Sequence, residues 1–152
     1  MTSGEDQQQY LVSCRCESAK AIVTLLNCLN HISSERSNSL QPVAVFCSPK
    51  SLAFHVYGKS KQIQSSVDMQ ASLFSDYKVT SCEGEEEWQS GGEFCVNLTT
   101  VLDCLNVLGT SNLDRTKVFL SYNTTSEILK LELLDESGAL CTAAIPGMLP
   151  PD

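Results

Sequence analysis

Residues 93–111, a strand that turns directly into a helix, constrain the fold of this chain more than any other segment. Phe94 to Val96 form a short apolar strand, and the side chain of Asn97 is suited to cap the free N–H groups of a first helical turn. Gly109 is typical of the position just past a helix end. Between these caps the apolar residues recur at helical spacing on one face: Leu98, Val101, Leu102, Leu105 and Leu108. The sequence therefore predicts an amphipathic helix that starts after Asn97 and stops at Gly109.

The order of elements along the chain predicts an α+β domain built from a repeated unit. Residues 10–15 read as a strand, and 17–31 carry a helical apolar stripe. Alternating or continuous apolar runs predict further strands at 42–48, 51–58, 63–74, 77–79, 117–123, 127–134 and 139–145. The runs at 42–48 and 51–58 form a hairpin around Pro49 and Lys50, and a turn at 135–138 joins the last two strands. A β-α-β-β-β unit thus occurs twice, with two helices packed on antiparallel sheets.

The element order and the segment VNLTTVLDCLNVLG resemble the sliding clamps, which have the PCNA-like fold. Within that group the segment is most similar to the Rad-one subunit of the nine–one–one checkpoint clamp. The resemblance implies that both helices line the inner wall of a ring around DNA while the sheets form its outer wall. Complete subunits of this family carry two such domains. We therefore expect a disordered tail at 1–8, the N-terminal clamp domain at 9–145, and a truncated connector or tail at 146–152.

The composition is that of one globular domain in a reducing compartment. The chain has 152 residues and a net charge of −8, so bulk charge disfavours non-specific binding to nucleic acid. A ring held by topology needs only a local stripe of positive charge. The polar N-terminus has no signal-peptide pattern. Four of the eight cysteines lie among apolar neighbours, which predicts unpaired thiols: Cys28, Cys95, Cys104 and Cys141. We expect no membrane contact and no cofactor, and the resemblance implies a nuclear location.

The polar stripe of the first helix is the candidate DNA-facing surface. Lys20, Thr24, Asn27 and His31 lie opposite its apolar residues. By the resemblance, these side chains and Thr99 and Asn106 of the second helix point toward the DNA channel. Asp103 opposes the one full positive charge, so direct contact would be weak and sensitive to salt. The alternative is an ordinary solvated helix face, with His31 complementing the helix dipole.

The last strand is the candidate subunit interface, with Leu140, Cys141, Thr142, Ala143 and Ile145 as its contact residues. Leu140, Thr142 and Ala144 alternate with Cys141, Ala143 and Ile145 across its two faces. The strand has no charge or internal proline of the kind that protects a free edge. The resemblance implies pairing with an edge strand from the second domain of a neighbouring subunit. The alternative is a strand covered by its own chain.

Three other motifs have less support. The glutamates at 83 and 85–87 suggest a metal-dependent 3′–5′ DNA exonuclease, but they crowd a glycine-containing loop rather than rigid strands. Lys59 and Lys61 at a turn suit either phosphate contact or solubility. Cys14 and Cys16, with Cys28 or His31, suggest zinc, although packing on one strand face explains the pair more simply. We therefore expect neither a catalytic residue nor a bound metal.

The resulting hypothesis is a non-enzymatic subunit, or a truncated form of one, of a heterotrimeric DNA-damage checkpoint clamp. Its expected partners are two other clamp subunits, a clamp loader and encircled double-stranded DNA. It would recruit signalling and repair factors during the cell cycle. The exonuclease is the main alternative, and a stand-alone α+β adaptor is the third.

Overall fold

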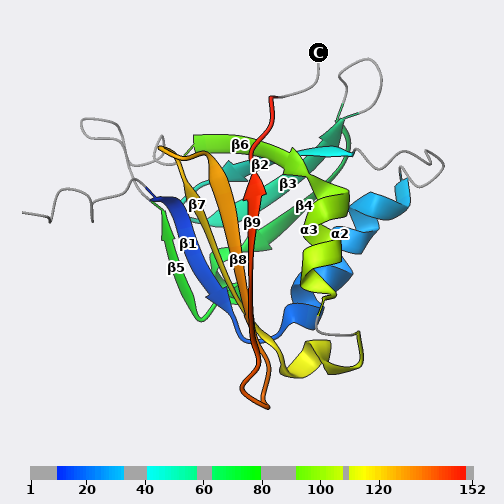
Figure 1. Cartoon of the computed structure of the whole chain (residues 1–152). Coiled ribbons are helices and arrows are strands. Elements are labelled where there is room, and N and C mark those ends of the chain that lie inside the picture. The colour runs from blue at the N-terminus through cyan, green and yellow to red at the C-terminus, as the bar shows by residue number, and fades with distance from the viewer. Residues whose placement is uncertain (1–9, 33–40, 58–62, 80–91, 108–109, 150–152) are drawn as a thin grey trace, which may run out of the picture.

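The computed structural model describes residues 10–32, 41–57, 63–79, 92–107 and 110–149 (Figure 1). The first repeat contains β1 (Tyr10–Cys16), α2 (Ala19–Ile32), β2 (Pro42–Cys47), β3 (Ser51–Tyr57) and β4 (Ile63–Gln70). A 3-10 turn, η1 (Ala71–Leu73), and β5 (Asp76–Val79) follow it. The second repeat contains β6 (Gly92–Asn97), α3 (Leu98–Leu105), η3 (Thr110–Arg115), β7 (Lys117–Asn123), β8 (Ile128–Leu134) and β9 (Leu140–Pro146). The α+β class and the twofold β-α-β-β-β order predicted from the sequence are confirmed.

Each repeat contributes its first strand to the sheet of the other repeat. One sheet has the order β5-β1-β7-β8-β9 and the other has the order β4-β3-β2-β6, and neighbouring strands are antiparallel. Thus β1 pairs with β7, and β6 pairs with β2. Because of this exchange neither repeat completes a sheet alone, and the two fold as one domain.

The two helices lie side by side on one side of the paired sheets (Figure 1). Helix α2 contacts β3 and β4, while α3 contacts β6, β8 and β9. The apolar face of α2 is buried, as its spacing predicts, at Ala19, Ile22, Val23, Leu26 and Leu29. Between the sheets the rings of Phe94 and Tyr122 stack with centroids 3.9 Å apart. One continuous core therefore holds both sheets and both helices.

Helix α3 begins where the sequence predicts but ends earlier. Asn97 is its N-cap, and its Oδ1 accepts hydrogen bonds from the N–H groups of Thr99 and Gln41 at 3.3 and 2.8 Å. The helix ends at Leu105, because the Asn106 side chain folds back and its Nδ2 donates to Leu102 O at 2.8 Å. The predicted extension was wrong at Asn106 and Val107, which form a turn, and Gly109 lies outside the described residues.

The segment predicted as one strand over 63–74 is divided. Strand β4 stops at Gln70, since Ala71 N–H donates to Lys50 O and the chain enters η1. The following strand, β5, does not continue the sheet of β4 but pairs with β1 in the other sheet. The Tyr77 hydroxyl links β5 to the other sheet, because it lies 2.7 Å from Ser48 O and 2.8 Å from Ser51 O and donates its hydrogen bond between them.

Glu17 joins the ends of three strands at one corner of the domain. Its carboxylate accepts hydrogen bonds from Ser75 Oγ at 2.7 Å and Arg15 Nε at 2.9 Å, and lies 3.8 Å from Lys117 Nζ. The Ser75 hydrogen bond, then that of Arg15, lowers the pKa of the Glu17 carboxyl below its ordinary value of 4.5. The ionised carboxylate is therefore favoured in the folded chain.

We expect Glu17 to contribute to stability above about pH 5, and the contribution to be lost as the pH falls through its lowered folded-state pKa. Urea midpoints of the native chain and of Glu17→Gln, measured between about pH 6 and pH 3, test this. The native midpoint should fall more steeply with acid than the Glu17→Gln midpoint. Parallel curves would mean that the carboxylate adds nothing that depends on its charge.

Candidate functional surfaces

The polar face of α2 lines a groove between the two helices and η3. The groove has a volume of about 460 Å³ and is lined by Lys20, Val23, Thr24, Asn27, Asn106, Leu113 and Asp114. Lys20, Thr24 and Asn27 are exposed, as the stripe predicts. The structure therefore brings together four of the six residues proposed to face DNA.

The other two proposed residues do not join this groove in the described structure. Thr99 is half-buried in the first turn of α3, where its N–H donates to the N-cap Asn97, and it does not line the groove. His31 belongs to α2, but its side chain lies outside the described residues. Asn106 lines the groove, but its Nδ2 already donates a hydrogen bond to Leu102 O at the end of α3.

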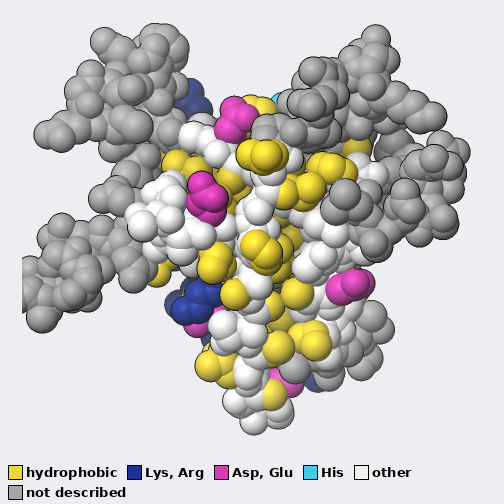
Figure 2. Space-filling model, turned by 45° about the horizontal axis from the view of Figure 1, so that its top comes forward, with side chains coloured by type: hydrophobic (Ala, Val, Ile, Leu, Met, Phe, Trp, Pro, Cys, Tyr) yellow, Lys and Arg dark blue, Asp and Glu magenta, His cyan; other side chains and the backbone are white. Residues whose placement is uncertain are grey.

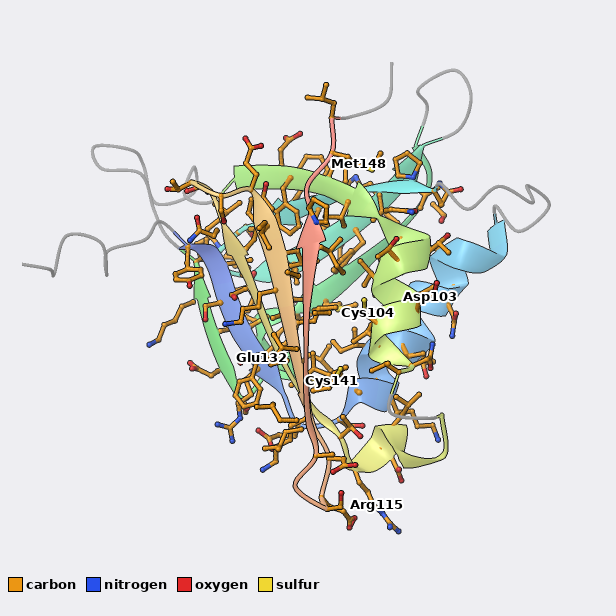
Figure 3. The ribbon with its side chains drawn as sticks, in the orientation of Figure 1. Asp103, Cys104, Arg115, Glu132, Cys141 and Met148 are labelled. Carbon is orange, nitrogen blue, oxygen red and sulfur yellow. The ribbon has the colours of Figure 1, made fainter. Side chains whose placement is uncertain are left out.

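The groove has little positive charge. Lys20 is its one basic lining residue among those described, and Asp114 lies in the same groove. Asp103 is exposed on α3 and points away from the sheets (Figure 3). An acid on η3 was not identified from the sequence, because only the folding of η3 against α2 brings Asp114 near Lys20. This surface can offer a phosphate one cation and several amide or hydroxyl groups.

Strand β9 is an edge strand of its sheet. It pairs with β8 and, among the described strands, with no other. Its residues alternate as the sequence predicts: Leu140, Thr142 and Ala144 are exposed, while Cys141 and Ala143 are half-buried. Leu140 is 62% exposed, whereas Ile145 is only 3% exposed and belongs to the core. Cys141 faces α3, where Cys104 lies (Figure 3).

The hydrogen bonds at the two ends of β9 show which of its peptide groups point outward. Asp135 N–H donates to Ala139 O at 3.1 Å, and Gly147 N–H donates to Glu127 O at 2.8 Å. Antiparallel pairing alternates along a strand, so 139, 141, 143, 145 and 147 direct their peptide groups toward β8. The N–H and C=O groups of Leu140, Thr142 and Ala144 therefore point toward the open edge.

Both ends of β9 are fixed in place. At the start, Asp135 Oδ1 accepts hydrogen bonds from Ser137 Oγ and from the N–H groups of Ser137 and Ala139. These bonds, that of Ser137 Oγ most of all, lower the pKa of the Asp135 carboxyl. At the end, Met148 N–H donates to Cys95 O at 2.8 Å, so the chain crosses from one sheet to the edge of the other. A Cβ on Gly147 would lie 3.0 Å from the Tyr122 hydroxyl, which explains why glycine suits this crossing. The hydrogen bonds that hold the two ends of β9 were not predicted from the sequence.

The remaining candidate motifs give no assembled site in the part of the chain that is described. Cys14 and Cys16 are buried in β1, and burial raises the pKa of the Cys14 thiol. Seven described cysteines are free, and Cys28 is exposed on α2 rather than packed among apolar neighbours. Within the described ranges, no three metal-ligating side chains come together. The glutamates at 83 and 85–87, Lys59 and Lys61 lie outside those ranges. No described helix is long and apolar enough to cross a bilayer.

This architecture is that of the DNA sliding clamps. The chain superposes on the PCNA of Thermococcus kodakaraensis with a TM-score of 0.66 and 16% identity, over 93% of this chain and 49% of that one. It superposes on the DNA polymerase III β subunit of Borrelia burgdorferi with a TM-score of 0.62 and 13% identity, over 99% of this chain and 33% of that one. The predicted PCNA-like fold is confirmed, and this chain spans about half and a third of these two relatives.

The sequence belongs to a particular family within that class. The family model described as repair protein Rad1/Rec1/Rad17 matches residues 11–150, so the chain is a member of that family. The resemblance drawn from the segment VNLTTVLDCLNVLG is confirmed. A search of curated proteins found no match.

Proposed function

We propose that this chain acts as the first domain of a subunit of a heterotrimeric DNA-damage checkpoint clamp in the nucleus. The observation that carries the proposal is the open, uncharged edge of β9, which is fastened at both ends. Pairing of that edge with a strand of a neighbouring subunit would extend one sheet across the boundary by main-chain hydrogen bonds. A clamp loader would place the ring on double-stranded DNA, and docked factors would carry checkpoint and repair signals.

In this proposal the DNA is held by encirclement rather than by strong contact. The groove that includes Lys20 faces the channel, and it offers one cation against the nearby Asp114. Each neutralised phosphate adds about 0.9 to the dependence of log affinity on log salt, so this domain contributes a slope of about 1 or less. The acidic net charge of −8 is compatible with this mode, because a closed ring stays on DNA without high affinity. The proposal assigns no catalytic residue.

The test is light scattering behind size exclusion on this chain mixed with the other two subunits of the checkpoint clamp. We expect a stoichiometric complex with the native chain and none with Thr142→Pro, which removes an outward N–H group and places a ring at the open edge. Thr142→Ser keeps the N–H group and should bind like the native chain. A folded native chain that enters no complex would refute the use of this edge.

A further inference from the structure

The open edge of β9 is suited to a second copy of itself. We infer that, when no other strand occupies this edge, two copies of the chain join through β9 in an antiparallel pair around a two-fold axis. The N–H groups of Leu140, Thr142 and Ala144 on each copy then find carbonyl partners on the other. This inference goes beyond the clamp proposal, since it requires only the open edge.

The side chains of β9 permit this symmetric contact. In a two-fold pair a charged residue near the axis approaches its own copy, but β9 carries no charge from Leu140 to Pro146. Figure 2 shows hydrophobic side chains in a band down the middle of the molecule, over β9 and the chain that follows it. Leu140 and Leu149 are the most exposed large apolar residues of this region, at 62% and 86%. Strand β9 also lacks the bulge or lysine that usually protects an edge.

The neighbouring charges on β8 select one register. In the sheet, Lys130 lies beside Ala144, and Glu132 lies beside Thr142, on the same exposed face. With Ala143 on the axis, Ala144 of one copy opposes Thr142 of the other. Lys130 and Ala144 of one copy then lie in line with Thr142 and Glu132 of the other, so opposite charges stand at the two ends of this line of four residues. With Thr142 on the axis, Glu132 would instead line up with Glu132 of the second copy, so the Ala143 register is favoured.

The other edge strands are less suited to the same contact. Strand β4 carries an exposed Asp68 near its centre, and β5 has only the residues Asp76–Val79. The edge of β6 already accepts a hydrogen bond from Met148 at Cys95 O. Among the described edges, β9 therefore combines the greatest length of uncharged strand with free peptide groups.

Sedimentation equilibrium of the chain alone, from about 1 to about 200 µM, tests the inference by mass action. We expect the mean mass to rise from 16.6 kDa toward twice that value. Thr142→Pro should remain at 16.6 kDa throughout, and Thr142→Ser should associate like the native chain. A native chain that stays monomeric, a mass that passes that of a dimer, or a dimer unaffected by Thr142→Pro would each overturn the inference.

Charge reversal tests the register. Lys130→Glu should weaken the dimer by about two- to five-fold at low salt, because a glutamate then faces Glu132 of the second copy. The double variant Lys130→Glu with Glu132→Lys should recover the native association. Lys130 and Glu132 also pair within one chain at 3.3 Å, so urea midpoints of the same variants separate folding stability from association. Failure of the double variant to recover, with folding unchanged, would refute the Ala143 register.

The outcomes separate this inference from the clamp proposal. A chain that is monomeric alone but joins the other clamp subunits refutes self-pairing and supports the proposal. A dimer that never exchanges with those subunits supports self-pairing and refutes the proposal. If both associations occur, each should exclude the other, because both need the outward peptide groups of Leu140, Thr142 and Ala144.

Discussion

Ala143→Pro is expected to lower the folding stability of the domain by several times more than Thr142→Pro, one position earlier, which is expected to leave it nearly unchanged. The N–H group of Ala143 points toward β8, opposite Leu131, so proline there breaks a ladder hydrogen bond and forces its ring into the sheet. The unpaired ladder group alone should cost about 1–3 kcal/mol, and the displaced ring adds to that loss, out of a typical total of about 5–15 kcal/mol. Urea unfolding followed by far-ultraviolet circular dichroism measures it.

The Thr142→Pro variant meets a different environment in the same strand. The N–H group that this variant loses is one that points to the open edge in the native chain, where proline is tolerated. Cys141, the residue before it, already has the extended conformation that a following proline requires. We expect a change of about 1 kcal/mol or less. Ala143→Ser, which keeps the N–H group at 143, is the matched control for the first variant. Equal losses for both prolines would contradict the assigned direction of the peptide groups, and both proposals for β9 would fall with it.

Local patterns in the sequence predicted the parts of the fold that depend on neighbouring residues. Asn97 was identified as a helix cap because the capping bond to Thr99 spans two residues. The turn at 135–138 and the alternation of Leu140 and Thr142 with Cys141 and Ala143 are equally local. The position of β9 and its two faces could therefore be predicted from the sequence, whereas its role as an interface edge came from the resemblance to the clamps and stays a proposal.

Features that depend on distant contacts were not predicted. Nothing near β5 in the sequence indicates that it leaves the sheet of β4, because its partner β1 lies more than sixty residues earlier. The same holds for Asp114, which reaches Lys20 only after η3 packs on α2, and for Met148, whose N–H group bonds to Cys95. The charge balance of the helix groove and the fastening of β9 therefore required the structure.

Leu131→Ala is expected to destabilise the domain by about 3 kcal/mol, within the range of about 2–5 kcal/mol for buried leucines. Leu131 is fully buried at the centre of β8, between Leu120 of β7 and Ala143 of β9. Since Ala143 is itself small, the cavity cannot be filled from the edge side. For a chain of this size the melting temperature should fall by about 6–12 °C.

Lys130→Ala is the matched control, because it precedes Leu131 in the same strand but is exposed on the opposite face. Its effect on the free energy of unfolding should stay within about 0.5 kcal/mol. Calorimetry of the two variants at dilutions where the native chain is monomeric keeps association at β9 out of the comparison. Similar losses for both would mean that the inner face of β8 does not support the core. The stability of the neighbouring β9 edge, which both proposals for β9 require, would then need another source.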